Sequence, residues 1–150
     1  MRTLAIDLGT RRVGLAMSDE GGRFATPLDV LTIGSPQQAH AEVLAIVRKE
    51  GVERLVVGVP INMDETFGPA ARVAIAWARN LAMAAGKPLV LIDERLSSFE
   101  ADQSLSDRKR GGEKMTRKDR KNRLDAIAAA NFLQAFLDGR LPALELDGTA

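Results

Sequence analysis

The chain has 150 residues, of which 45% are hydrophobic and 27% charged, and this composition is typical of one globular domain. No run approaches the ~18–20 consecutive apolar residues that a membrane helix needs. The absence of cysteine excludes disulfides and thiolate metal sites. The first apolar run contains the charged residue Asp7, which is not typical of a secretory signal peptide. We therefore expect a single domain over residues 1–150, located in the cytoplasm and not in a membrane.

The net charge of +1 hides an uneven distribution of charge. Residues 104–123 hold nine Lys or Arg and three acidic residues, whereas the remainder of the chain holds twelve basic and seventeen acidic residues. Such a concentration of positive charge favours a nucleic acid as partner, although runs of charge are also common in solvated loops. Because Gly111 and Gly112 lie inside the run, we expect a mobile basic loop over about 107–119.

The first third of the chain has the pattern of consecutive strands. Residues 4–8 and 13–18 are apolar runs joined by the short "GTRR", which is typical of a hairpin. A third run, "RFATPLDVLTI", follows the turn at Gly21 and Gly22. The pattern predicts three strands with no helix between them.

Helices and strands alternate in the rest of the chain. The capping box that starts at Ser35, with Pro36 at the first helical position, predicts a helix that continues to Gly51. Continuous apolar strands between helices indicate a parallel pair, so we expect an α/β fold with a mixed five-stranded sheet: a three-stranded antiparallel meander plus two parallel strands, with helices on both faces. The elements expected after the first helix are a strand at 54–60, a loop at 61–69, a helix at 70–85, a strand at 89–94, a short helix from about 97 and a last helix at about 120–137.

Acidic residues interrupt the apolar pattern at three places. Asp7 lies near the end of the first strand, and Asp93 and Glu94 end the fifth, where successive side chains face opposite sides. Asp125 falls on the same face of the last helix as two phenylalanines. If the first and fifth strands are adjacent and parallel, Asp7 and Glu94 come close together at the ends of the strands.

Carboxylates that lie this close repel each other, and a divalent cation would remove the repulsion. Oxygen ligands without cysteine or a nearby histidine favour Mg²⁺ or Mn²⁺ over zinc. Two such ions can support an in-line phosphoryl displacement. Each acid also has a plainer explanation. Asp7 would pair with Arg11 or Arg12, Glu94 would pair with Arg95 or another surface arginine, and Asp125 would stabilise the first turn of its helix.

Aromatic residues make up only 4% of the chain, so base stacking is not expected to dominate nucleic-acid binding. We expect His40 to lie on the surface, and Trp77 and Met83 to serve helix packing instead of base stacking. Phosphate contacts from Lys and Arg would hold a nucleic acid without reading its sequence, and a glycine lets a phosphate approach the backbone. The residues expected to contact nucleic acid are Gly9, Thr10, Arg11, Arg12, Arg95, Arg108, Lys109, Arg110, Lys114, Arg117 and Lys118.

Four stretches, "LAIDLGTRRVGLAMSD", "VVGVPINMD", "IDERLSS" and "DAIAAANFLQAFL", resemble in order and spacing the motifs of the YqgF (RuvX-type) family. That family is described as Holliday-junction resolvases and pre-16S rRNA processing nucleases with an RNase H-like fold. The resemblance implies a metal-dependent endonuclease that acts on structured RNA or branched DNA through two Mg²⁺ or Mn²⁺ ions. It also implies that Asp7, Glu94 and Asp125 are the metal-binding acids. The chain departs from the family at Glu65, near which a glycine is expected, and in "DERLSS", where threonines are commoner.

Two other functions fit part of the pattern. The motif "DLGT" also occurs in nucleotide-binding proteins of the actin and sugar-kinase type, but those bind nucleotide between two such domains, and this length supplies one. A nucleic-acid-binding module without catalysis would use the acids only to shape the edge of the sheet. Junction cleavage on two strands would favour a symmetric homodimer.

Overall fold

The structure, a computed structural model, describes residues 1–95 and 117–144, with side chains of the last helix described from residue 124 onward. The helix expected at about 97 and four of the expected nucleic-acid contacts (Arg108, Lys109, Arg110 and Lys114) lie outside the described residues. Arg117 and Lys118 are described as backbone only.

Five strands form one mixed sheet in the order β3-β2-β1-β4-β5. The pairs β1/β2 and β2/β3 are antiparallel, and the pairs β1/β4 and β4/β5 are parallel. This arrangement confirms the predicted meander joined to a parallel pair. The strands are β1 (Thr3–Leu8), β2 (Arg12–Ser18), β3 (Ala25–Thr32), β4 (Arg54–Val59) and β5 (Leu89–Asp93).

Three helices are described: α1 (Pro36–Glu50), α2 (Pro69–Ala85) and α4 (Arg117–Leu137). The Ser35 hydroxyl accepts a hydrogen bond from the Gln38 N–H at 3.1 Å, which confirms the predicted cap. Helix α4 begins three residues earlier than expected, so the end of the expected basic loop is helical; Arg and Lys are good helix formers. No helix in the described part of the chain is long and apolar enough to cross a membrane.

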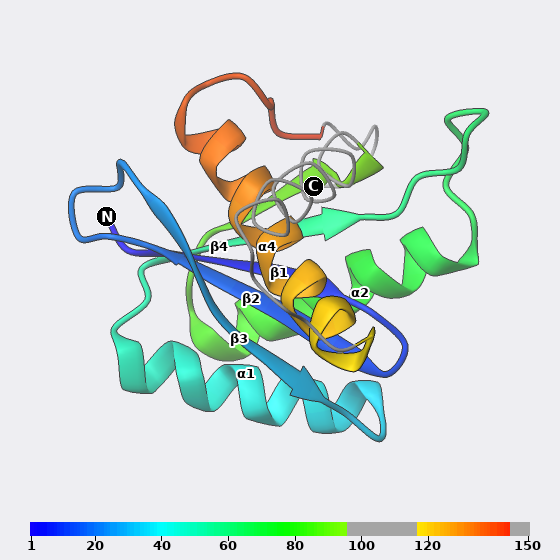
Figure 1. The fold of residues 1–150 in the computed structure, drawn as a ribbon, viewed down its shortest axis with the longest axis horizontal. Coiled ribbons are helices and arrows are strands. Elements are labelled where there is room, and N and C mark those ends of the chain that lie inside the picture. The colour runs from blue at the N-terminus through cyan, green and yellow to red at the C-terminus, as the bar shows by residue number, and fades with distance from the viewer. Residues whose placement is uncertain (96–116, 145–150) are drawn as a thin grey trace.

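The two faces of the sheet are covered differently. Helices α1 and α2 lie on one face, and α4 crosses the other in front of β1 and β2 (Figure 1). Large aliphatic side chains such as Leu4, Ile6 and Leu15 fill the core under α1 and α2. On the α4 face the sheet presents small residues, including Ala5 and Ala16, which lets that helix pack closely.

Candidate active site

The carboxyl groups of Asp7 and Glu94 are hydrogen-bonded to each other on the α4 face. Asp7 lies near the end of β1, and Glu94 directly follows β5. These strands are not neighbours, because β4 lies between them, so the expectation that they are adjacent is wrong. The two side chains meet across the middle strand.

Gly58 in β4 makes that contact possible. Ile6 pairs with Val57, which places Asp7 beside Gly58 on the neighbouring strand. A Cβ atom at residue 58 would lie 3.0 Å from the Glu94 Cβ, 3.0 Å from the Glu94 Oε2 and 3.0 Å from the Phe132 ring. The Glu94 side chain therefore occupies space that the side chain of any residue larger than glycine at position 58 would need. The sequence signal was a single glycine inside the apolar strand "RLVVGVP", and sequence reasoning missed it.

Gly14 has a matching role on the other side of Asp7. Asp7 pairs with Gly14 of β2. A Cβ atom at residue 14 would overlap the backbone carbonyl oxygen of Asp125 in α4. Glycines thus flank Asp7 on both neighbouring strands, one making room for Glu94 and the other for α4.

The carboxylate of Asp125 is held by Arg12 at the start of β2. The Arg12 Nε donates to the Asp125 Oδ2 at 2.8 Å, and both side chains are about one-third exposed (32% and 31%). Asp125 acts on Asp7 and Glu94 through its charge and is not hydrogen-bonded to them. Within residues 1–95 and 124–144, no three acids or histidines are arranged as a ready-made metal site. The plain alternative for Asp125 is wrong, since α4 begins at Arg117 and Asp125 is not in its first turn.

The acidic pair shares a proton in the metal-free protein. Burial, followed by the neighbouring Asp7 charge and the hydrogen bond to it, raises the pKa of Glu94 to about 9. Burial also raises the pKa of Asp7. Two carboxyl groups can hydrogen-bond only when one of them is protonated, so at neutral pH Glu94 donates and Asp7 accepts. With Glu94 protonated and Asp7 ionised, the pair carries a single negative charge. Its carboxyl oxygens are the kind of ligand that Mg²⁺ or Mn²⁺ prefers.

Asp93 and Arg95 form a separate network. The Arg95 Nη2 donates to the Asp93 Oδ2 at 2.6 Å, and its Nη1 donates to the Asn62 carbonyl oxygen at 3.0 Å. Although burial alone would raise it, these Arg95 hydrogen bonds lower the pKa of Asp93. Asp93 thus pairs with Arg95 while Glu94 contacts Asp7, as expected for neighbours that face opposite sides of a strand; that only Glu94 joins the site stays a prediction. Because Arg95 pairs with Asp93, much of its guanidinium group is already engaged.

The first hairpin lies beside the acidic pair, because it follows Asp7 directly. The Gly9 N–H donates to the Arg12 carbonyl oxygen at 2.9 Å, and a Cβ atom on Gly9 would lie 2.6 Å from that oxygen. The turn itself therefore requires this glycine, independently of any phosphate. Thr10 and Arg11 are exposed at the tip. Neither Arg11 nor Arg12 is an ion-pair partner of Asp7 in the described structure, which excludes the plain alternative for Asp7.

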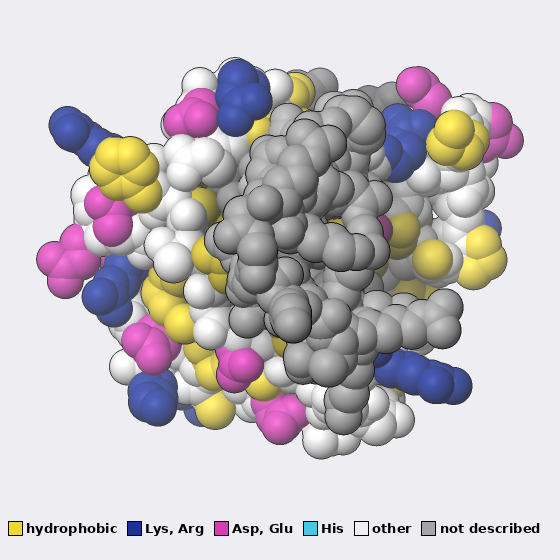
Figure 2. All heavy atoms as spheres, viewed as in Figure 1, with side chains coloured by type: hydrophobic (Ala, Val, Ile, Leu, Met, Phe, Trp, Pro, Cys, Tyr) yellow, Lys and Arg dark blue, Asp and Glu magenta, His cyan; other side chains and the backbone are white. Residues whose placement is uncertain are grey.

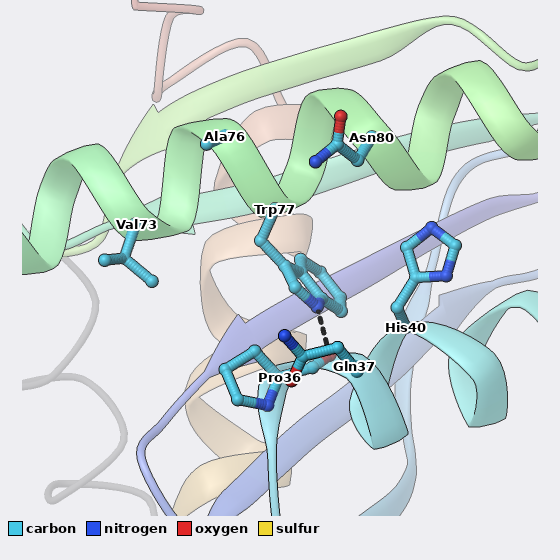
Figure 3. A pocket seen from close by; sticks show the side chains of 7 residues that line it. All are labelled: Pro36, Gln37, His40, Val73, Ala76, Trp77 and Asn80. Atoms are coloured by element: carbon cyan, nitrogen blue, oxygen red, sulfur yellow. Dashed lines mark hydrogen bonds between the residues drawn. The ribbon is translucent and has the colours of Figure 1, made fainter.

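A pocket of about 430 Å³ lies between α1 and α2 (Figure 3). These helices cover the face of the sheet opposite α4, so the pocket is on the other side of the sheet from the acidic pair. The Trp77 Nε1 donates to the Pro36 carbonyl oxygen at 3.0 Å, and Trp77 is 6% exposed, which confirms that it packs between helices. The same expectation is wrong for Met83, which is 80% exposed on α2. His40 lines the rim and is half-buried. No acidic side chain is among the described residues that line this pocket, so its chemistry is distinct from that of the site.

Figure 2 shows the α4 face, where Lys and Arg side chains are interspersed with Asp and Glu side chains around its rim. In this view the described side chains form no continuous positive surface. The strongly basic part of the sequence, residues 104–123, carries side chains that lie outside the described set. The described residues thus supply the acids of the site and a few nearby arginines.

Comparisons with known proteins identify the family and the fold of the chain. A protein of Anaeromyxobacter dehalogenans named as a pre-16S rRNA nuclease is 44% identical over 142 residues, which cover 95% of this chain and 100% of that protein. Among solved structures, Thermus thermophilus RuvC superposes with a TM-score of 0.60 at 19% identity, covering 96% of this chain and 100% of that one. The same protein in complex with a Holliday junction substrate gives 0.58 at 22% identity, with the same coverage. These two structures establish the RuvC-like fold. The family model described as "RuvX: Holliday junction resolvase" matches residues 1–139, and the chain belongs to that family.

Proposed function

We propose that the protein is a divalent-metal-dependent endonuclease that hydrolyses phosphodiester bonds in structured nucleic acid. The observation that carries the proposal is the contact between Asp7 and Glu94 across Gly58. Burying two carboxyl groups against each other is unfavourable for a purely structural site, because removing a charge from water costs several kcal/mol unless it is compensated. A bound cation would compensate both charges.

Asp7 and Glu94 are the residues that would hold the metal, with Asp125 as the third acid. When bound, Mg²⁺ or Mn²⁺, as one ion or two, supplies positive charge that activates water and stabilises the leaving oxygen of the phosphodiester. Glu94 gives up the proton that it holds in the metal-free protein, so that both carboxylates can ligate. The hairpin beside Asp7 presents Thr10 and Arg11 to solvent, where they can contact a phosphate.

The basic segment 104–123 would hold the polyanionic backbone, including through Arg108, Lys109, Arg110, Lys114, Arg117 and Lys118. Replacing three of these residues with alanine should weaken binding to all sequences about equally. The slope of log K against log salt is negative, and it should become less steep by roughly 0.9 for each phosphate of duplex DNA that the variant no longer neutralises. An unchanged slope would contradict a role for this segment.

The proposed endonuclease could act on structured RNA or on branched DNA. Relatives are named as pre-16S rRNA nucleases, and a structural neighbour was solved with a Holliday junction. A junction has two equivalent strands to cut, which favours a symmetric pair of chains on that substrate. Light scattering of the protein with and without junction DNA would measure the number of chains bound.

The test is cleavage of four substrates: precursor rRNA, four-way junction DNA, linear duplex and single strands. Each is incubated with Mg²⁺, Mn²⁺ or EDTA. We expect cleavage only with metal, and we expect D7N to abolish it while nucleic-acid affinity persists. The matched control is D29N, because Asp29 is exposed on β3, away from the acidic pair. Cleavage in EDTA would exclude a metal mechanism, and active D7N would exclude this site.

Calorimetry gives a second test that does not depend on activity. Because Glu94 holds a proton at neutral pH, Mn²⁺ binding at pH 7 should release about one proton. Titrations in buffers with different ionisation enthalpies measure that number. A non-catalytic binding module would bind nucleic acid without cutting it, and adding Mn²⁺ to such a module would release no proton to the buffer.

A further inference from the structure

The ion pair between Arg12 and Asp125 joins two residues that the proposed function needs for different ligands. Asp125 is an acid beside the acidic pair, and Arg12 lies in the hairpin next to Asp7. The charge of Asp125 is felt by both Asp7 and Glu94, so its carboxylate lies within electrostatic range of them. Its hydrogen bond, however, is to the guanidinium of Arg12. While that hydrogen bond persists, the Asp125 carboxylate is paired with the positive charge of Arg12.

The contact is of a kind that a ligand can replace. It is a single hydrogen bond from Nε, at 2.8 Å, and both partners are about one-third exposed. The two Nη groups of Arg12 have no acceptor among the described residues. Arginine binds phosphate through paired N–H groups, and this geometry is stronger than a one-point contact. A backbone phosphate arriving at the hairpin therefore competes with Asp125 for the same guanidinium.

We propose that Arg12 is a positioning residue that exchanges partners, from Asp125 in the free protein to a substrate phosphate in the complex. This proposal rests on the proposed function, because it assumes that metal and nucleic acid both bind here. The exchange leaves Asp125 free to join Asp7 and Glu94 only when nucleic acid is present. Metal binding and substrate binding then become linked, and each strengthens the other.

The first experiment measures Mn²⁺ affinity without nucleic acid, by calorimetry, on the intact chain. Substituting R12Q should tighten Mn²⁺ binding by about fivefold, in the lower range of typical coupling between sites. Substituting R12K, which keeps the charge near Asp125, should remain close to the parent. The matched control is R11Q, which removes the same charge from the exposed side chain of the preceding residue. R11Q should change Mn²⁺ affinity much less than R12Q.

A double-mutant cycle separates partner exchange from a general effect of charge. In a D125N background, R12Q should no longer tighten Mn²⁺ binding, because its effect acts through Asp125. Equal effects of R12Q in both backgrounds would overturn the proposal. An R11Q effect as large as that of R12Q would also overturn it.

The second experiment measures affinity for four-way junction DNA in EDTA. Substituting D125N frees Arg12, so it should tighten junction binding by about fivefold. In an R12Q background, D125N should give little of that gain. A gain that survives R12Q would show that only net charge matters and would overturn the exchange. Melting temperatures of all variants identify any that are unfolded.

Failure of this inference is distinguishable from failure of the proposed function. If the parent binds Mn²⁺ with proton release and binds junction DNA, but the two cycles are additive, Arg12 is only an electrostatic neighbour and the proposed site stands. If the parent binds neither ligand, the proposed function itself is wrong.

Discussion

The two faces of the sheet use the same five strands for different purposes. Under α1 and α2, alternate residues of β1 and β2 are large and aliphatic, as at Leu4, Ile6 and Leu15. Under α4, the intervening positions are small or acidic, as at Ala5 and Asp7. Because side chains alternate along a strand, a single residue step separates the two roles.

This difference shows how a small domain accommodates a destabilising site. The aliphatic face buries large side chains, each worth about 1.5–3 kcal/mol. The α4 face gives up part of that area at Gly14 and Gly58, and in return it brings three carboxylates near one another. The α4 face keeps a core of its own around Phe132 and Leu133, but it also carries the proposed chemistry, which the α1/α2 face does not. Mutations on the two faces should have opposite signatures.

The largest expected effect is on cleavage, from E94Q on the α4 face. Glutamine keeps the size and hydrogen-bonding capacity of the protonated acid but cannot ligate as a carboxylate. Even residues that only support metal ligands typically cost about 10–100-fold when mutated, so we expect more than roughly 100-fold loss in kcat. Single-turnover cleavage with Mn²⁺ measures it, against D29N as control. An E94Q enzyme of near-parental rate would break the assignment of chemistry to this face.

On the opposite face, L15A should remove about 2–5 kcal/mol from the free energy of unfolding, because Leu15 is fully buried. Urea denaturation measures the loss. The cleavage rate per folded molecule should stay at the parental value. A fall in that rate would show that the two faces are coupled more tightly than their packing indicates.

Adding a methyl group on the α4 face, by G58A, should affect the proposed site more than the stability of the fold. In G58A the new Cβ would lie 3.0 Å from Glu94 and from the Phe132 ring, so one of these neighbours must shift. We expect Mn²⁺ affinity to fall by about 10-fold, comparable to the loss of a residue that supports a ligand. Calorimetry measures the Mn²⁺ affinity. The control is A84G on the exposed surface of α2, which lowers stability without touching the site. G86A is not a suitable control, because Gly86 has a positive φ of 67°.

The pH dependence of stability should report the shared proton. The pKa of Glu94 is raised from 4.5 to about 9 in the folded protein, so between those values the folded state holds a proton that the unfolded state has released. Stability of the metal-free parent should therefore be greatest at the low end of this window and fall as the pH rises toward 9. In E94Q this fall should be largely absent. Urea denaturation in EDTA, from pH 5 to pH 9, makes the comparison.

The smallest expected effect comes from the loop between β4 and α2. Glu65 has a φ of 68°, which is the left-handed region that favours glycine. Its ion pair with Arg95 is long, at 3.9 Å, and the Glu65 side chain is 83% exposed, so the pair contributes little. E65G should therefore raise the free energy of unfolding by up to about 1 kcal/mol without changing cleavage. A destabilised E65G would show that the loop needs the Glu65 side chain.

Local patterns predicted most of the fold because they act over a few residues. The capping box at Ser35, the alternation in the first strands and the apolar runs of β4 and β5 each define an element within its own stretch. The departure from the family at Glu65 was also visible in the sequence. The structure gives its physical meaning, since this is the one described non-glycine residue with a positive φ.

The sequence by itself determined the elements, the sheet class and the three acids worth testing. Only the tertiary structure decided which groups meet: Asp7 reaches Glu94 across β4, Asp125 pairs with Arg12, and Arg95 pairs with Asp93. The physical reason is that periodicity fixes which way a side chain points from its own element. Its partner depends on the register of other strands and on how closely a helix packs. At this site, the glycines at 14 and 58 control that packing.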